Sequence, residues 1–360
     1  MLTHQRIYSL DLLKTLGTVI IVFHHYQQYM EVTFASGINF FAGAFPFQYT
    51  VELFFLLSGF FAWHYIRRIQ NGLPFLDFFG RTWLRFAPFL IIGAFGSGLL
   101  HLVYQKLFHE LFLNTSVSLW SILKAALGVH DGWMFLPRQP INGHTWYVSI
   151  LFLCYIILWL LVKLSQRRDL ALLPLFAVMI VLGIIFWERG GSLPFLCQSD
   201  ARGYISFFFG LLFASYLERQ SPSRKDISLA FAIILILTIL FIFKPVYVED
   251  GLSYLLIFLY YPCLIIILLS APVRKLFDHS WIGTLSAVAF NTYMWHGSIL
   301  LALRILTNLH PQFLALQSRV TMYAVTAVCF LYGTVSHYIL EKPYNNYLSA
   351  RLPEKNPKVK

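Results

Sequence analysis

Long apolar runs dominate the chain and recur from one end to the other. A helix that spans a bilayer needs about 20 predominantly apolar residues, with a range of about 17–25. Ten runs approach that length, and each is bounded by charged residues, Pro or Gly. The pattern predicts ten membrane-spanning helices, over residues 10–30, 49–66, 83–104, 147–163, 170–187, 202–217, 227–243, 253–270, 283–305 and 320–340.

The composition supports this interpretation. Of the 360 residues, 58% are hydrophobic and 12% are charged, whereas soluble domains carry about 45–50% apolar and about 25% charged residues. A soluble enzyme, a nucleic-acid-binding protein and a disordered chain are therefore excluded, despite the net charge of +11. We expect an all-α polytopic membrane protein, with one ten-helix domain over residues 1–345. A basic tail over residues 346–360 is expected to be cytoplasmic and disordered.

The basic residues are distributed unevenly between the two sides of this arrangement. On ten alternating helices, 19 of the 27 Lys and Arg residues fall on one side, while the acidic residues divide evenly. Lys and Arg are enriched in cytoplasmic loops, so both termini are predicted to be cytoplasmic. The four cysteines show neither a disulfide framework nor a zinc-binding spacing, so no metal site is expected.

The first predicted helix carries a polar stripe. At about 100° per residue, Asp11, Lys14, Thr18 and His25 fall within an arc of about 60°, and His24 points about 100° away from His25. Ionisable residues at membrane depth are costly and commonly functional. A lysine that reaches toward the interface and a histidine at the interface would also fit, but the alignment of four residues favours a functional site at His25.

Other polar residues lie within predicted helices. Glu52, near the outer end of the second helix, is either a rim residue in water or a partner that orients His25. Ser58 either permits close helix approach or contacts substrate. His296, in the ninth helix, is either a structural histidine or a substrate contact.

The connection between the second and third helices holds four arginines and no lysine: Arg67, Arg68, Arg81 and Arg85. Cytoplasmic topology alone would place basic residues here. Arginine, however, binds phosphate bidentately, so the cluster also predicts a phosphate-bearing ligand that arrives from the cytosol. On the other side, the long connection 105–146 includes His144 and Trp146, which are either sugar contacts or part of an interfacial aromatic belt.

These segments together resemble the acyltransferase-3 family of integral membrane O-acyltransferases. The resemblance covers the full chain, through RIYSLDLLKTLGTVIIVFHH, VELFFLLSGFF, RTWLRFAP, NGHTWYVSILF, NTYMWH and HYILEKP, in that order. The chain departs from the family pattern at Lys14, where Arg is usual, at Glu52, where Asp is usual, and at Leu151, where Glu is common.

The resemblance implies an enzyme of the bacterial inner membrane that moves an acyl group, usually acetyl, from cytoplasmic acetyl-CoA. The acceptor would be a hydroxyl of an extracytoplasmic carbohydrate or lipid-linked glycan of the cell envelope, with no metal and no nucleic acid involved. His25 would be the general base or acyl carrier, supported by Glu52. Lys14, Arg67, Arg68, Arg81 and Arg85 would hold acetyl-CoA, and Ser58, His144, Trp146 and His296 would contact substrate.

A second interpretation is a transporter or flippase, in which the intramembrane charged residues relay protons or bind cargo. The sequence shows no internal repeat and no paired helices broken by Gly or Pro, which are typical of such transporters.

Overall fold

The computed structural model describes residues 6–133, 140–243 and 249–352. Within these ranges the chain is almost entirely helical. The helices are α1 (Tyr8–Met30), α2 (Thr50–Gln70), α3 (Phe75–Phe108), α4 (Leu119–Leu127), α5 (Trp146–Arg168), α6 (Leu172–Arg189), α7 (Gln198–Arg219), α8 (Arg224–Phe243), α9 (Glu249–Leu255), α10 (Tyr261–Leu269), α11 (Ala271–Leu276), α12 (Ser280–Leu309), α13 (Arg319–Ser336) and α14 (Lys342–Arg351). Shorter elements are η1 (Phe47–Tyr49), η2 (Phe112–Asn114), η3 (Gly143–Thr145), η5 (Leu256–Tyr260), η6 (His337–Glu341), β1 (Ser192–Leu193) and β2 (Leu196–Cys197).

Each of the ten predicted segments coincides with a helix or with consecutive helices. The segment 253–270 corresponds to α9, η5 and α10, and 320–340 corresponds to α13 and η6. The largest difference is in α3, which begins at Phe75 rather than at residue 83 and is 34 residues long. Such a helix is about 51 Å long, whereas the hydrocarbon core of a bilayer is about 30 Å thick. Its first turns therefore extend beyond the predicted span and carry Arg81.

In the part of the chain that the structure describes, six helical segments are long and apolar enough to cross a membrane, by length and composition: Phe75–Phe108, Gly143–Arg168, Leu172–Arg189, Arg224–Phe243, Gly251–Leu269 and Arg319–Arg351. Two of them, α6 and α8, are only 17% buried within the protein, compared with 56% for the segment that contains α5. Apolar helices that are so exposed suit contact with lipid. That α1, α2, α7 and α12 also cross the membrane remains a prediction.

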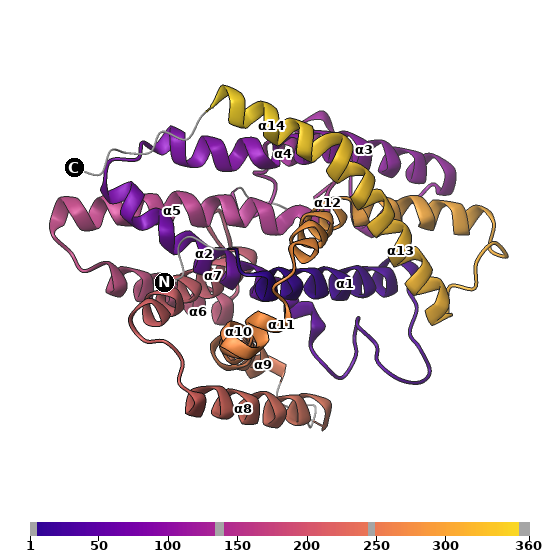
Figure 1. Ribbon diagram of the computed structural model, residues 1–360. Helices are drawn as coiled ribbons and strands as arrows, with labels where there is room; N and C mark the ends of the chain where they lie inside the picture. Colours follow the sequence, from indigo (N-terminus) through magenta and orange to yellow (C-terminus); the bar gives the residue numbers. More distant parts are fainter. Residues whose placement is uncertain (1–5, 134–139, 244–248, 353–360) are drawn as a thin grey trace.

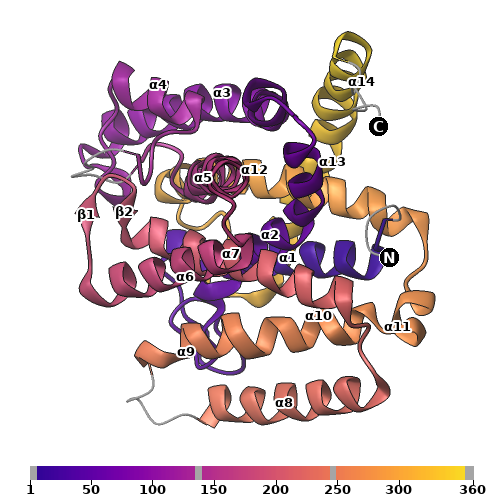
Figure 2. The same ribbon diagram turned by 90° about the vertical axis from the view of Figure 1, so that its left-hand side faces the viewer.

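The helices lie side by side, with α5 near the middle of the molecule and α8 at its edge (Figures 1 and 2). The outlying α8 packs mainly against α10. Between α6 and α7, the strands β1 and β2 form a short antiparallel hairpin. The main packing contact is between α2 and α7.

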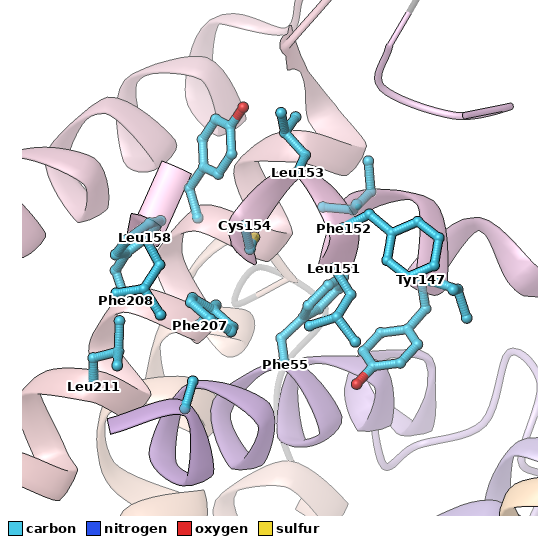
Figure 3. Close-up of a cluster of buried hydrophobic side chains, with 14 of the residues drawn as sticks. Phe55, Tyr147, Leu151, Phe152, Leu153, Cys154, Leu158, Phe207, Phe208 and Leu211 are labelled. Carbon is cyan, nitrogen blue, oxygen red and sulfur yellow. The ribbon is translucent and has the colours of Figure 1, made fainter. Parts of the chain in front are cut away.

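The largest hydrophobic cluster lies between α2, α5 and α7 (Figure 3). Its fully buried rings include Phe55 from α2, Phe152 from α5 and Phe207 from α7. Gly59 makes this packing possible, because a Cβ at that position would collide with the carbonyl oxygen of Phe207. Of the two roles expected for Ser58, close helix approach therefore belongs to its neighbour Gly59.

The chain ends differently from the prediction. Residues 346–351, assigned by sequence to a disordered tail, belong to α14, and residues 353–360 lie outside the described part of the chain. Nη1 of Arg81 donates a hydrogen bond to the carbonyl oxygen of Leu352 at 2.8 Å. The end of α14 is thus held against the start of α3.

Candidate functional site

A large cavity opens at the end of the helix bundle where the start of α3 meets α14. Its volume is about 740 Å³, and α1, α2, α3, α5, α12 and α14 all contribute to its lining. Cavities of about 300–1,000 Å³ are typical of small-molecule and cofactor sites. We call it the basic cavity, because four cationic side chains singled out from the sequence line it. These are Lys14, Arg68, Arg81 and Arg85.

The predicted arginine cluster is divided by the fold. Arg81 and Arg85 lie one turn apart on α3, as expected if that stretch is helical, and both line the basic cavity. The guanidinium of Arg67 instead pairs with Glu218 at 3.0 Å, and the Arg67 side chain is 77% exposed. Because Arg67 and Arg68 are adjacent on α2, their side chains project about 100° apart. The structure therefore leaves Arg67 out of the cavity that Arg68 lines, contrary to the prediction.

The polar stripe predicted on the first helix follows the wall of the basic cavity. Asp11, Lys14 and Thr18 all line it. Nζ of Lys14 donates to a carboxylate oxygen of Asp11 at 3.0 Å and lies 4.5 Å from the centre of the Phe61 ring. Nε of Arg6 donates to the other carboxylate oxygen of Asp11. Asp11 thus fixes two cations at the wall of the cavity.

At the other end of the basic cavity lie three aromatic rings, Phe54, Tyr147 and Tyr293, which we call the aromatic layer. Neighbouring ring centres are 5.9–6.2 Å apart. The hydroxyl of Ser58 lines the same cavity and hydrogen-bonds the hydroxyl of Tyr147 at 2.7 Å. The hydroxyl of Tyr293 donates to the carbonyl oxygen of His144 at 2.7 Å. The layer is therefore held in place by hydrogen bonds as well as by packing.

Beyond the aromatic layer, α1 and α12 bring two histidines together. Nδ1 of His25 lies 2.8 Å from Nε2 of His296, and the two rings stack with their centres 5.0 Å apart. We call them the histidine pair. Tyr293 connects the pair to the basic cavity, since its ring lies 5.7 Å from that of His296 and also lines the cavity. The neighbouring His24 lies on another face of α1, as predicted, with Nδ1 2.8 Å from the carbonyl oxygen of Phe40.

The hydrogen bonds of the histidine pair determine where its protons lie. Nδ1 of His296 is 2.7 Å from the carbonyl oxygen of Tyr293, which can only accept a hydrogen bond. Nδ1 of a neutral His296 therefore carries its proton, and Nε2 is left as an acceptor. It follows that Nδ1 of His25 donates to His296, so the lone pair of a neutral His25 is on Nε2. A backbone carbonyl and a second imidazole thus prepare His25 as a base or nucleophile.

His144 approaches the pair from the start of α5. Its ring centre is 4.6 Å from that of His296, and Nε2 lies 3.0 Å from the carbonyl oxygen of Met294. Gly297 allows this approach, because a Cβ there would overlap the His144 ring. His144 also lines a second cavity of about 40 Å³, on the far side of the pair from the basic cavity. We call it the small cavity.

The loop before α5 is tied to that helix, which fixes the position of His144. The hydroxyl of Ser149 donates to the carbonyl oxygen of Asp131 at 2.8 Å. The hydroxyl of Thr145 lies 3.2 Å from Nε2 of His130. Burial raises the pKa of Asp131 to about 6 and lowers the pKa of His130 to about 3, so His130 is neutral at pH 7.

Glu52 and Trp146 belong to a separate cluster. Both carboxylate oxygens of Glu52 accept hydrogen bonds from Arg202, and the Glu52 side chain is fully buried. The same guanidinium lies 4.7 Å from the Trp146 ring. Glu52 was expected to orient His25, but the structure gives that position to His296. The reason is that α2 packs most closely on α7, so Glu52 meets Arg202 rather than α1.

Two residues of this region were not selected from the sequence. Tyr293 lies within the NTYMWH segment but was not singled out there. His101 lies in α3 and lines the small cavity. It is an ionisable residue inside a predicted span, so the criterion that selected His25 would also have selected His101.

The sequence profile of a known family, described as an acyltransferase domain, matches residues 7–339, nearly the whole chain. The protein therefore belongs to the acyltransferase-3 family, and it is a membrane acyltransferase. No curated protein and no solved structure gives a significant match. The family match favours the acyltransferase over the transporter or flippase. Among the described residues, no group of three His, Cys, Asp or Glu side chains is placed to hold a metal ion.

Proposed function

We propose that the protein is an O-acyltransferase that moves an acetyl group from cytoplasmic acetyl-CoA to a hydroxyl of an extracytoplasmic carbohydrate or lipid-linked glycan. The proposal places it in a bacterial inner membrane, with both termini cytoplasmic. The observation that carries it is the position of the histidine pair between two cavities, one basic and large, the other small and on the opposite side.

The basic cavity is the proposed donor site. Arg81 and Arg85 present two guanidiniums on one face of α3, where phosphate groups of CoA would be bound bidentately. Arg68 lines the same cavity from α2. With its phosphates there, the donor would extend its thioester along α1, past Lys14, toward the aromatic layer. Tyr293, which touches both the cavity and His296, marks where the acyl group would reach the histidine pair.

The chemistry follows from the lone pair on Nε2 of His25. As a general base, His25 takes the proton of the acceptor hydroxyl while the hydroxyl oxygen attacks the thioester carbonyl carbon. The carbon–sulfur bond then breaks, and the proton passes from His25 to the leaving sulfur, which gives an ester and free CoA. His296 stabilises the imidazolium, because it accepts the Nδ1–H of His25 throughout. The same lone pair would also allow His25 to carry the acyl group itself.

The function is tested with purified protein, acetyl-CoA and a cell-envelope glycan fraction, by measuring CoA release and acetylation of the glycan. His25→Ala should lower acyl transfer by about 10²- to 10⁴-fold, as expected for loss of a general base. The matched control is His24→Ala, on another face of α1, which should retain transfer. Acetyl-CoA binding should persist in both variants. Active His25→Ala protein would contradict the proposal, and so would wild-type protein that neither binds acetyl-CoA nor releases CoA.

A further inference from the structure

The small cavity adjoins the histidine pair through two of its lining residues, although neither His25 nor His296 lines it. His144, which lines it, has its ring centre 4.6 Å from that of His296. Tyr29 also lines it, with its ring centre 5.9 Å from that of His25. A group bound in the small cavity would therefore lie next to the residues that contact the histidine pair, opposite the donor.

One lining residue of the small cavity, His101, has a buried ring nitrogen without a well-placed hydrogen-bond partner. His101 is 8% exposed and packs on Phe112. Within the described part of the chain, Nδ1 of His101 makes no hydrogen bond of good geometry. Buried polar atoms are nearly always paired, so an unpaired one beside a cavity indicates a polar guest.

The size of the small cavity restricts that guest. A single water needs about 10–15 Å³ on this measure, so about 40 Å³ corresponds to roughly three waters. A hydroxymethyl group fits such a space, whereas a sugar ring does not. A secondary hydroxyl is attached to a ring carbon, so the ring would have to enter with it. A primary hydroxyl reaches in on its own methylene and leaves the ring outside.

We propose that the small cavity is the subsite for the acceptor hydroxyl, that it selects a primary alcohol, and that His101 is the positioning residue for that hydroxyl. This inference rests on the proposed function. The alcohol oxygen forms the new bond to the acyl carbon of the thioester as the carbon–sulfur bond breaks. The alcohol proton moves to Nε2 of His25 and then to the CoA sulfur. His101 holds the hydroxyl by a hydrogen bond and exchanges no proton in the step.

The selectivity is tested with two isomeric probes, 1-propanol and 2-propanol, given to the purified protein with acetyl-CoA in lipid nanodiscs. Propyl acetate formation is measured by gas chromatography, and each rate is divided by that of the imidazole-catalysed reaction in solution. The primary alcohol should be preferred by at least about tenfold after this correction, since one methyl group in a closed pocket discriminates by about 10- to 200-fold. Leu301→Ala, which enlarges the lining, should reduce the preference.

The role of His101 is tested by separating KM from kcat. His101→Ala should raise the KM for 1-propanol by about tenfold, the effect of one hydrogen bond. His101→Gln should recover part of that loss, because it keeps a donor and an acceptor. The matched control is His109→Ala at the exposed end of the same helix, which should not change the KM.

Three results would overturn the inference: equal corrected rates for the two alcohols, no propyl acetate although acetyl-CoA is cleaved by water, or an unchanged KM in His101→Ala. The last would mean that the small cavity holds ordered water only. A protein that does not bind acetyl-CoA would instead contradict the proposed function, so the two failures are distinguishable.

Discussion

His296 determines the tautomer of His25, so its removal is the most direct test of the arrangement at the histidine pair. In His296→Ala the Nδ1–H of His25 loses its acceptor. A buried donor left without a partner costs about 1–3 kcal/mol. If that cost falls on the transition state, where the imidazole becomes charged, kcat should drop by about 5- to 150-fold, at tenfold per 1.36 kcal/mol. The loss should be smaller than that of His25→Ala.

The KM for acetyl-CoA should stay constant in this variant, because the basic cavity ends at the aromatic layer, short of His296. Initial rates of CoA release over a range of acetyl-CoA concentrations give both parameters. Met294→Leu is the matched control, since Met294 is equally buried on α12 and its backbone contact to His144 is retained. An unchanged kcat in His296→Ala would refute the tautomer argument. A loss as large as that of His25→Ala, with an acyl group recovered on His296, would show that His296 itself reacts.

Three further predictions address the donor site, the buried ion pair and the topology. Arg81→Ala and Arg85→Ala should each weaken acetyl-CoA binding, measured by calorimetry, by about 1.5–3 kcal/mol. Arg67→Ala, outside the basic cavity, should leave this affinity unchanged. Equal losses in all three variants would contradict the assignment of the basic cavity as the donor site. Glu52→Gln should lower stability by about 3–5 kcal/mol because it removes the negative charge that pairs with Arg202. The double variant, Glu52→Gln with Arg202→Met, should recover thermal stability, which a catalytic role alone would not explain. Reporter tags at both chain ends and between α2 and α3 should be cytoplasmic, and a cytoplasmic tag after α3 would refute the ten-helix topology.

Sequence reasoning located the helices because apolar length is a local property of the chain. The polar stripe could be predicted equally well, since Asp11, Lys14 and Thr18 are related by helical geometry alone. The partner of His25 could not be predicted in this way. His296 lies 271 residues away, and only the packing of α1 on α12 brings the two rings together.

Glu52 shows the same limit of sequence-based prediction for a residue whose expected partner was wrong. Its position near one end of the second helix was clear from the sequence, but the helix it faces was not. That choice depends on the close contact at Gly59, which draws α2 onto α7 and places Glu52 against Arg202. A glycine in an apolar run predicts that some helix approaches closely, without indicating which one.

The two cavities also bear on the choice between catalysis and transport. A transporter must open a passage as wide as its cargo, first to one side and then to the other. Here the aromatic layer and the histidine pair lie between a cavity of about 740 Å³ and one of about 40 Å³. Cargo that fills the first could not enter the second. A two-carbon acyl group needs only to pass Tyr293, so a bond exchanged at His25 would carry it across while CoA and the acceptor stay on their own sides. In this conformation, the difference in size between the cavities therefore fits the proposed exchange of an acyl group at His25.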